Sequence, residues 1–192
     1  MSSLVLTGDT SGTITVAAPA VAGTNTLTLQ AATATNSVNT LATAVASTSG
    51  TSITFSSIPS WVKRVTVMFQ GVSTSGTSNP IIQVGSGSVT TSGYTGTSMR
   101  GAANGTAYVA NSTGFNLNNS NNAASTLYGH LVLTLISGST YICSGVVTSG
   151  TNEGQIVSGS IALSGALDRV VLTAVNGTDT FDAGSVNILY EG

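Results

Sequence analysis

The stretch LVLTLISGSTYICSGVV, residues 131–147, holds two apolar runs separated by Ser137, Gly138 and Ser139. Three small residues around a central glycine have the length of a tight hairpin loop. The flanking runs are rich in Leu, Val, Ile and Thr, and β-branched residues are common in strands. The stretch therefore predicts an antiparallel β-hairpin.

Comparable runs lie on both sides of this hairpin. Together with its two strands, the expected strands are residues 51–55, 61–69, 81–84, 107–109, 125–136, 140–147, 155–163, 168–175 and 185–190. Segments rich in Gly, Ser and Asn separate them, which is typical of turns and loops. Short strands joined in this way predict an all-β head that is an antiparallel β-sandwich or a jelly roll.

The run 61–69 alternates in the manner of a strand with one buried face. Val65, Val67 and Phe69 fall on one side. Met68 falls on the other side, which indicates that this second face is partly covered as well.

The end of the head suggests a second hairpin. Asn176 and Gly177 follow the strand 168–175, and the chain then returns through residues 185–190. The clean alternation within 185–190 predicts a central or near-central strand.

Residues 1–48 differ from the head, which we expect to occupy residues 49–192. They contain short alternating pieces interrupted by Pro19 and Gly23, with nothing large enough to build a core. Such a segment orders itself only against something else, so we expect an extended N-terminal arm that docks on a partner. Within it, residues 37–47 place apolar side chains at helix-like spacing, which suggests a short helix or coil.

The composition limits the class of partner. Charged residues make up 5% of the 192 residues, against about a quarter in an ordinary soluble domain. Only four residues are Lys or Arg, too few for nucleic-acid binding. No apolar run approaches the ~20 residues of a membrane-spanning helix. A net charge of −2 gives little repulsion between copies, so self-association is expected.

Candidate catalytic groups are few, and we expect neither an enzyme nor a bound cofactor. Asp179 and Asp182 are close in sequence and, with Glu153, are the carboxylates a polysaccharide depolymerase would use. Turn aspartates that bond their own backbone are the simpler explanation. The loop 176–182 could also offer oxygen atoms to a calcium ion.

Cys143 and His130 each stand alone. A single cysteine cannot form an internal disulfide, and Cys143 is expected to be a small buried hydrophobic residue. His130 is expected to be a hydrogen-bonded strand residue; three copies around a trimer axis could instead form a metal-binding or pH-sensitive cluster.

The amide-rich loop NNSNN, residues 118–122, has aromatic residues nearby in the sequence and is the candidate recognition surface. Such loops bind sugars through hydrogen bonds and ring stacking, whereas the alternative is an ordinary solvated loop. The candidate recognition residues are Tyr108, Asn111, Phe115, Asn119 and Asn121.

The few large aromatic and charged residues of the chain are expected to serve core packing and strand register. Trp61 would cover the edge of the core where the arm meets the head. Lys63 and Arg64 would pair with carboxylates, Asp168 and Asp182 being the candidates.

Two blocks of sequence resemble a known family. IPSWVKRVTVMFQGVSTSGTSNPIIQVGSG (residues 58–87), followed by SGYTGTS, and LDRVVLTAVNGTDTFDAGSVNILYEG (residues 167–192) look like the C-terminal domain of tailed-bacteriophage virion structural proteins, usually labelled tail fibres. GTITVAAPAVAGTNTLTLQAATAT (residues 12–35) is similar to the linker that precedes such domains. The resemblance implies a non-enzymatic homotrimer with a slender N-terminal arm and a C-terminal β head.

The resemblance leaves the position on the particle open. Residues 1–48 would bind other virion proteins on the tail or the capsid surface. The chain could be a short fibre whose head contacts the host, a capsid head fibre or cement protein, or an adhesin that binds a host surface glycan.

Overall fold

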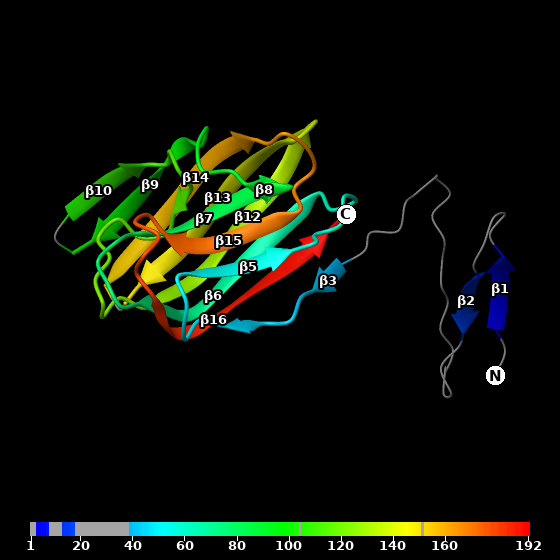
Figure 1. Ribbon diagram of the computed structural model, residues 1–192, viewed down its shortest axis with the longest axis horizontal. Coiled ribbons are helices and arrows are strands. Elements are labelled where there is room, and N and C mark those ends of the chain that lie inside the picture. Colours follow the sequence, from blue (N-terminus) through cyan, green and yellow to red (C-terminus); the bar gives the residue numbers. More distant parts are fainter. Residues whose placement is uncertain (1–2, 8–12, 18–38, 104, 151) are drawn as a thin grey trace. The chain divides into compact units, whose positions relative to one another are not determined.

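The computed structural model describes two separate units of the chain (Figure 1). The described residues are 3–7, 13–17, 39–103, 105–150 and 152–192. In the first unit, residues 1–36, strand β1 (Ser3–Thr7) pairs antiparallel with β2 (Thr13–Ala17). The rest of the predicted arm up to residue 38 lies outside the described residues. The second unit, residues 37–192, is the head.

One layer of the head is a nine-stranded antiparallel sheet. In spatial order its main path runs β10 (Gly105–Ala110), β9 (Thr95–Ala102), β14 (Glu153–Ala162), β13 (Thr140–Ser149), β12 (Leu127–Ser137), β6 (Arg64–Thr74), β16 (Phe181–Glu191) and β3 (Asn39–Leu41). The short β4 (Val45–Ala46) also pairs with β16. Every pairing in this sheet is antiparallel.

The second layer is a five-stranded sheet that covers one face of the first (Figure 1). Its order is β11 (Phe115–Asn116), β7 (Pro80–Ser86), β15 (Arg169–Ala174) and β5 (Ser52–Ser56), and β8 (Ser88–Val89) pairs with β7. The head is therefore an antiparallel β-sandwich, as the strand pattern predicts.

Strand periodicity builds the core between the sheets. Along β6 the residues Val65, Val67 and Phe69 are buried, and in β12 Leu131 and Leu133 are fully buried. These side chains belong to one apolar cluster that spans both sheets. Burying one such side chain contributes about 1.5–3 kcal/mol, more than an exposed ion pair at about 0–1 kcal/mol. The core therefore dominates the stability of this weakly charged head.

The predicted hairpin at residues 131–147 is confirmed. Strands β12 and β13 pair along their length, with Ser137 opposite Thr140. Gly138 in the loop has a φ of 54°, a left-handed conformation that glycine adopts without strain. Met68, on the outward face of β6, is partly buried, as the prediction for the second face required.

The second predicted hairpin is wrong, because β15 and β16 lie in different sheets. After β15 the chain turns at Gly177, whose N–H donates to the Ala174 carbonyl at 2.9 Å. Residues 176–180 then carry it across to β6, where Phe181 lies opposite Thr74. Five residues reach up to ~17 Å, enough to cross the ~10 Å between packed sheets.

The helix or coil predicted at 37–47 is wrong where the structure describes it. Residues 39–41 and 45–46 instead form β3 and β4 along the free edge of β16, and the Ala42 N–H donates to the Ile188 carbonyl at 2.9 Å. The backbone groups of an unpaired edge attract such additions. The head thus begins before the predicted residue 49, and β16 has only short strands on its outer side.

Candidate functional site

The asparagine-rich segment at residues 111–125, which contains the predicted recognition loop, is folded into the head. Phe115 and Leu117 are fully buried in the core between the sheets. Phe115 packs edge-on against Tyr94, with ring centroids 5.0 Å apart. Because these apolar residues point inward, the neighbouring amides of Asn116 and Asn118 are drawn into the interior.

Asn111 holds the start of this segment against the large sheet. Its Oδ1 accepts hydrogen bonds from the Ser98 hydroxyl at 3.1 Å and the Asn116 N–H at 3.0 Å. Its Nδ2 donates to the Ser158 carbonyl at 3.1 Å. A buried amide whose donor and acceptor are both engaged in this way holds the loop against the sheet.

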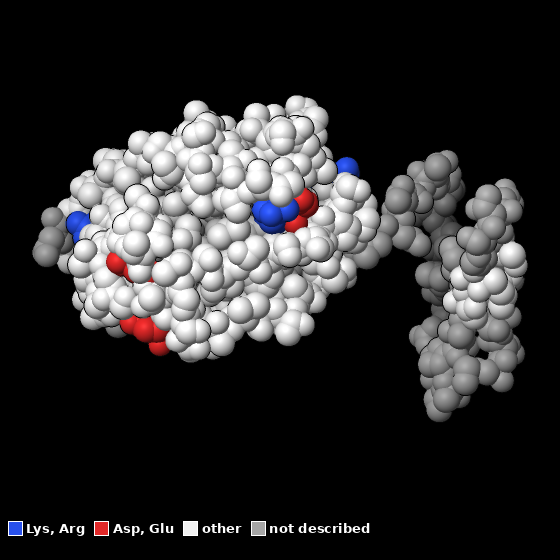
Figure 2. Space-filling view, in the orientation of Figure 1, with Lys and Arg blue, Asp and Glu red and all other residues white. Residues whose placement is uncertain are grey.

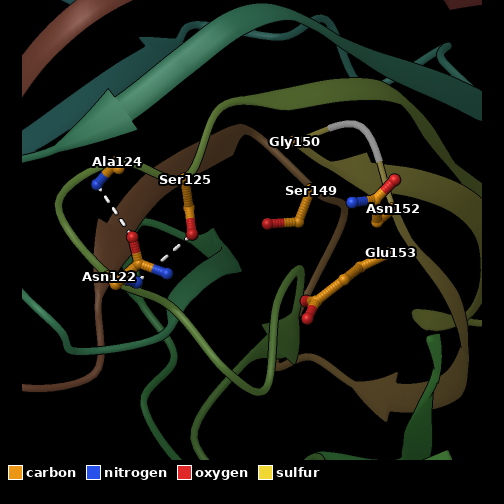
Figure 3. A pocket seen from close by; sticks show the side chains of 7 residues that line it. All are labelled: Asn122, Ala124, Ser125, Ser149, Gly150, Asn152 and Glu153. Atoms are coloured by element: carbon orange, nitrogen blue, oxygen red, sulfur yellow. Dashed lines mark hydrogen bonds between the residues drawn. The ribbon is translucent and has the colours of Figure 1, made fainter. Parts of the chain in front are cut away.

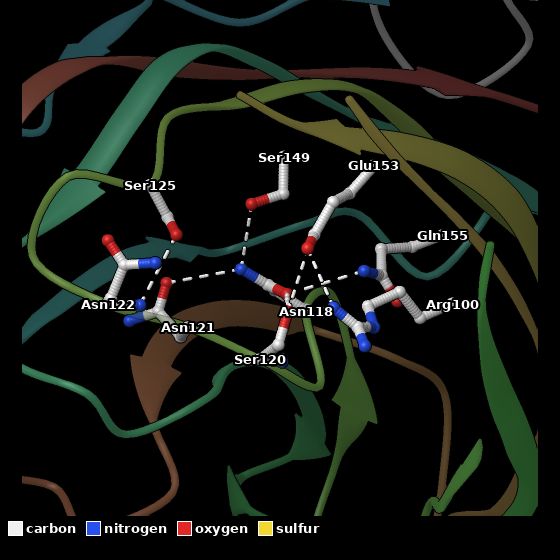
Figure 4. A network of polar contacts seen from close by, with 9 residues as sticks. All are labelled: Arg100, Asn118, Ser120, Asn121, Asn122, Ser125, Ser149, Glu153 and Gln155. Carbon is white, nitrogen blue, oxygen red and sulfur yellow. Dashed lines mark hydrogen bonds and ion pairs between the residues drawn. The ribbon is translucent and has the colours of Figure 1, made fainter. Parts of the chain in front are cut away.

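Asn118 is the centre of a buried polar network (Figure 4). Its Nδ2 donates to Ser149 Oγ at 2.9 Å and to Asn121 Oδ1 at 3.3 Å. Its Oδ1 accepts from the Ser120 N–H at 3.0 Å and from Gln155 Nε2 at 3.3 Å. One side chain therefore joins its own segment to β13 and β14.

Asn121 extends the network to the loop after β6. Its Nδ2 lies within hydrogen-bond distance of Thr74 Oγ1 at 2.9 Å, the Ser78 carbonyl at 3.0 Å and the Gly76 carbonyl at 3.3 Å. The segment is thus tied to the connection that links the two sheets.

An ion pair closes the network on its outer side. Arg100 NH1 donates to Glu153 Oε1 at 2.7 Å, and the Ser120 hydroxyl donates to Glu153 Oε2 at 2.8 Å. Both carboxylate oxygens are therefore engaged, and the charge of Glu153 is neutralised by the neighbouring guanidinium.

Several buried polar atoms of this region have no partner within the described residues. They are Arg100 Nε, Asn116 Oδ1, both side-chain polar atoms of Asn119, and Gln155 Oε1. Each such atom lowers stability relative to a satisfied one by about 1–3 kcal/mol. The network is therefore sensitive to the loss of further hydrogen bonds.

A small polar pocket opens beside the network (Figure 3). It measures about 250 Å³ and is lined by Asn122, Ala124, Ser125, Ser149, Gly150, Asn152 and Glu153. Asn122 and its neighbours form a turn, in which the Ala124 N–H donates to Asn122 Oδ1 at 2.9 Å. Amides and hydroxyls of this kind can hydrogen-bond a neutral polyol, whereas the lining offers no aromatic ring for stacking.

The predicted recognition residues do not gather at this pocket. Asn111, Phe115 and Asn121 are interior residues, and the polar atoms of Asn119 are buried. Tyr108 is 67% exposed but lies on β10 and does not line the pocket. The accessible residues beside the pocket are instead 122–124, which composition alone did not single out.

The carboxylates considered for depolymerase chemistry do not gather at the pocket. Glu153 is the only carboxylate that lines the pocket, whereas glycoside hydrolysis uses two facing carboxyl groups. Asp179 accepts from Asn176 Nδ2 at 2.7 Å and from the Ser78 N–H at 2.9 Å, and these bonds hold its pKa below its usual range. Residues 176–179 form a turn in which Asn176 Oδ1 accepts from the Thr178 and Asp179 N–H groups, and Asp182, at the start of β16, is exposed.

The predicted partners of Lys63 and Arg64 are wrong. Arg64 pairs with Glu191 at 2.6 Å because the two residues lie opposite each other in β6 and β16. Asp168 pairs with its neighbour Arg169 at 2.8 Å, and Asp182 makes no ion pair in the described part of the chain. The Arg169 side chain, helped by the Gly87 N–H, lowers the pKa of Asp168. Figure 2 shows such charges as isolated spots on an uncharged surface.

Trp61 packs at one end of the head, as expected of a packing residue. Its ring lies 5.9 Å from that of Tyr190, and it remains 39% exposed. Its position relative to the N-terminal unit is not part of the described structure.

Cys143 is buried in the core, and burial raises the pKa of its thiol to about 12. Thiolate is the reactive form, so the native protein should not react with a thiol reagent at pH 8. We expect no labelling of the native chain over an hour and one label per chain in denaturant. A native protein that is labelled as fast as the denatured chain would contradict this burial.

His130 stands on the outward face of β12, opposite Met68 in β6 and Val146 in β13. Within the described residues no group of three or more His, Cys, Asp or Glu is arranged to hold a metal ion. The described part of one chain therefore does not by itself assemble a metal cluster at His130.

No family model, curated protein or solved structure matches this chain. Within the described residues no helix is long and apolar enough to cross a membrane.

Proposed function

We propose that this chain is a non-enzymatic structural component of a tailed-bacteriophage virion. In this proposal it is a short trimeric fibre-like protein on the tail or capsid surface. The N-terminal unit, residues 1–36, attaches to other virion proteins, and the β-sandwich head is exposed.

The observation that carries this proposal is the division of the chain into two unequal units. In its described part the first unit is a two-stranded hairpin of five-residue strands. A single two-stranded hairpin is at best marginally stable in water, so this unit gains stability by docking on a partner. The head contains its own core and needs no such help.

Composition and resemblance support the same proposal. A nearly uncharged surface rich in hydroxyls and amides suits a protein that is part of a large symmetric assembly. The blocks at residues 58–87 and 167–192, which resemble phage virion proteins, form the whole of β6, β7, β15 and β16, strands from both sheets.

The proposal is tested by deleting residues 1–36. Tagged full-length and truncated chains would be produced separately in host cells in which the phage assembles. We expect the full-length chain in purified particles and at least about a tenfold loss of the truncated chain, since docking through the first unit is removed. Circular dichroism of the purified truncated chain would verify that the head is folded.

Two outcomes would count against this proposal. Equal incorporation of both chains would show that the first unit is not the attachment element. Absence of the full-length chain from particles would dispose of a virion role. Labelling the tag in imaged particles separates a tail fibre from a capsid head fibre or cement protein.

The pocket at residues 122–125 and 149–153 favours a second candidate, a glycan-binding adhesin. Its amides and hydroxyls could bind the hydroxyl groups of a host polysaccharide. Binding of the purified chain to host cells, lost on Asn152→Ala, would support this function. Equal cell binding by the variant would place any binding surface elsewhere.

A further inference from the structure

The outward face of the nine-stranded sheet carries a row of large uncharged side chains. Residues that lie opposite each other in neighbouring strands point to the same face of a sheet. The pairings therefore align, from β10 to β6, the residues Tyr108, Met99, Ile156, Val146, His130 and Met68.

Much of this row is open to solvent. Ile156 and Val146 are each about half exposed, and Tyr108 is more so. On the same face, Ile142 of β13 and Tyr128 of β12 are also exposed. Exposed apolar patches larger than a few hundred Å² are uncommon on monomeric proteins and mark contact surfaces.

The face carries no carboxylate and no Lys or Arg across β9, β10, β12, β13 and β14. The two such residues within these strands, Arg100 and Glu153, face the segment that holds Ser120 and pair with each other. At the margin, Arg64 of β6 is paired with Glu191. A charged partner would find nothing to pair with here, whereas a second uncharged face would be complementary without repulsion.

The size of the face suits a stable contact between proteins. Six strands from β10 to β6 at ~4.8 Å spacing span ~24 Å, and the eight steps from Tyr128 to Ile136 span ~27 Å. The resulting area of about 650 Å² approaches the ~800 Å² that each partner contributes to a standard interface.

We infer that this face, the outward side of β6, β12, β13, β14, β9 and β10, is where copies of this chain bind one another. The occupant is a second copy because the face is uncharged across five strands, carries the apolar row and approaches the area of a standard interface. This inference deepens the oligomeric part of the proposed function and rests on it. Around a three-fold axis each face would meet both neighbours, so the area of about 650 Å² is what one chain would bury against the two together.

His130 makes the contact sensitive to pH. It lies beside Tyr128 and Val132 on β12 and faces Met68 of β6 and Val146 of β13. The further outward neighbours are Thr66 and Gln70 on β6 and Ser144 and Thr148 on β13, so none of the described side chains beside His130 on this face is acidic. Histidine side chains gain charge as the pH falls from about 8 to 5, and an unpaired charge disfavours burial in an apolar contact.

The inference is tested by placing a charge in the middle of the row with Val146→Asp. A matched control is Val175→Asp, since Val175 is equally exposed, at 52% against 53%, but follows β15 in the other sheet. The mass of the full-length chain would be measured by sedimentation from about 1 to 100 µM. We expect an oligomer for wild type and Val175→Asp, and at least about a tenfold weaker association for Val146→Asp.

Unchanged thermal melting of Val146→Asp, extrapolated to low concentration, would verify that the variant is folded. A folded Val146→Asp that associates like wild type overturns the inference. If the oligomer of Val146→Asp is lost when residues 1–36 are also deleted, the copies associate through the first unit. The proposed function as a trimeric virion protein is then not contradicted. A wild-type chain that is monomeric at about 100 µM also overturns the inference. A dimer abolished by Val146→Asp upholds the face but contradicts the three-copy assembly.

The pH dependence of association distinguishes a contact that includes His130 from a contact elsewhere on the chain. Wild type is expected to dissociate at least about tenfold more readily at pH 5 than at pH 8, and His130→Gln should lose most of this difference. The same pH dependence in both proteins would place His130 outside the contact and overturn its role.

Discussion

Gly159→Ala is expected to lower the free energy of unfolding of the head by about 3 kcal/mol. Gly159 lies on β14 and faces the interior, where a Cβ atom would press on the Thr95 carbonyl and come within 3.1 Å of the Phe115 ring. Backbone and a buried ring cannot move aside as a flexible side-chain end can, so adding one methyl group strains the contact between the sheet and the loop segment.

Gly154→Ala is the matched control, because Gly154 lies on the same strand and a Cβ there meets no described atom within 4 Å. This change should alter stability by less than about 0.5 kcal/mol. Both would be measured by urea unfolding at one protein concentration, followed through the fluorescence of Trp61, the only tryptophan. Equal midpoints for the two variants would show that the close approach at Gly159 is not real.

Sequence periodicity predicted the strands that bury one face. The alternation of Val65, Val67 and Phe69 matches their burial, and the loop at 137–139 matches the β12–β13 hairpin. Strand β9, TGTSMRGA, was missed because it has no apolar alternation. Pairing with β14 and β10 makes it a strand, and such pairings between distant segments cannot be seen in a single sequence.

The polar interior could not be predicted from composition. An asparagine-rich composition is typical of a solvated loop. Only the spacing of Phe115 and Leu117, two residues apart, indicates that the segment turns inward. The partners that satisfy Asn118, such as Ser149 and Gln155, lie 31 and 37 residues away. The ion pair of Arg64 with Glu191 likewise depends on which strands are neighbours, because 127 residues separate them.

Asn118→Ala is expected to destabilise the head by about 3–4 kcal/mol, the sum of more than one unsatisfied group. The Asn118 side chain takes part in five hydrogen bonds and is fully buried. Removing its amide leaves Gln155 Nε2 without this partner, while Gln155 Oε1 already has none within the described residues. Gln155 would then be an uncompensated amide in the interior, and a cavity would add to the loss.

Asn122→Ala separates this effect from the general loss of an asparagine in the segment. Asn122 is exposed, and the hydrogen bond that its Oδ1 accepts from the Ala124 N–H can be replaced by water. The loss should therefore stay below about 1 kcal/mol. Urea midpoints compared at an unchanged slope would measure both variants. If Asn118→Ala were no more harmful than Asn122→Ala, the buried network would not be what holds this segment inside the head, and the segment would be free to act as the exposed recognition loop that its composition suggests.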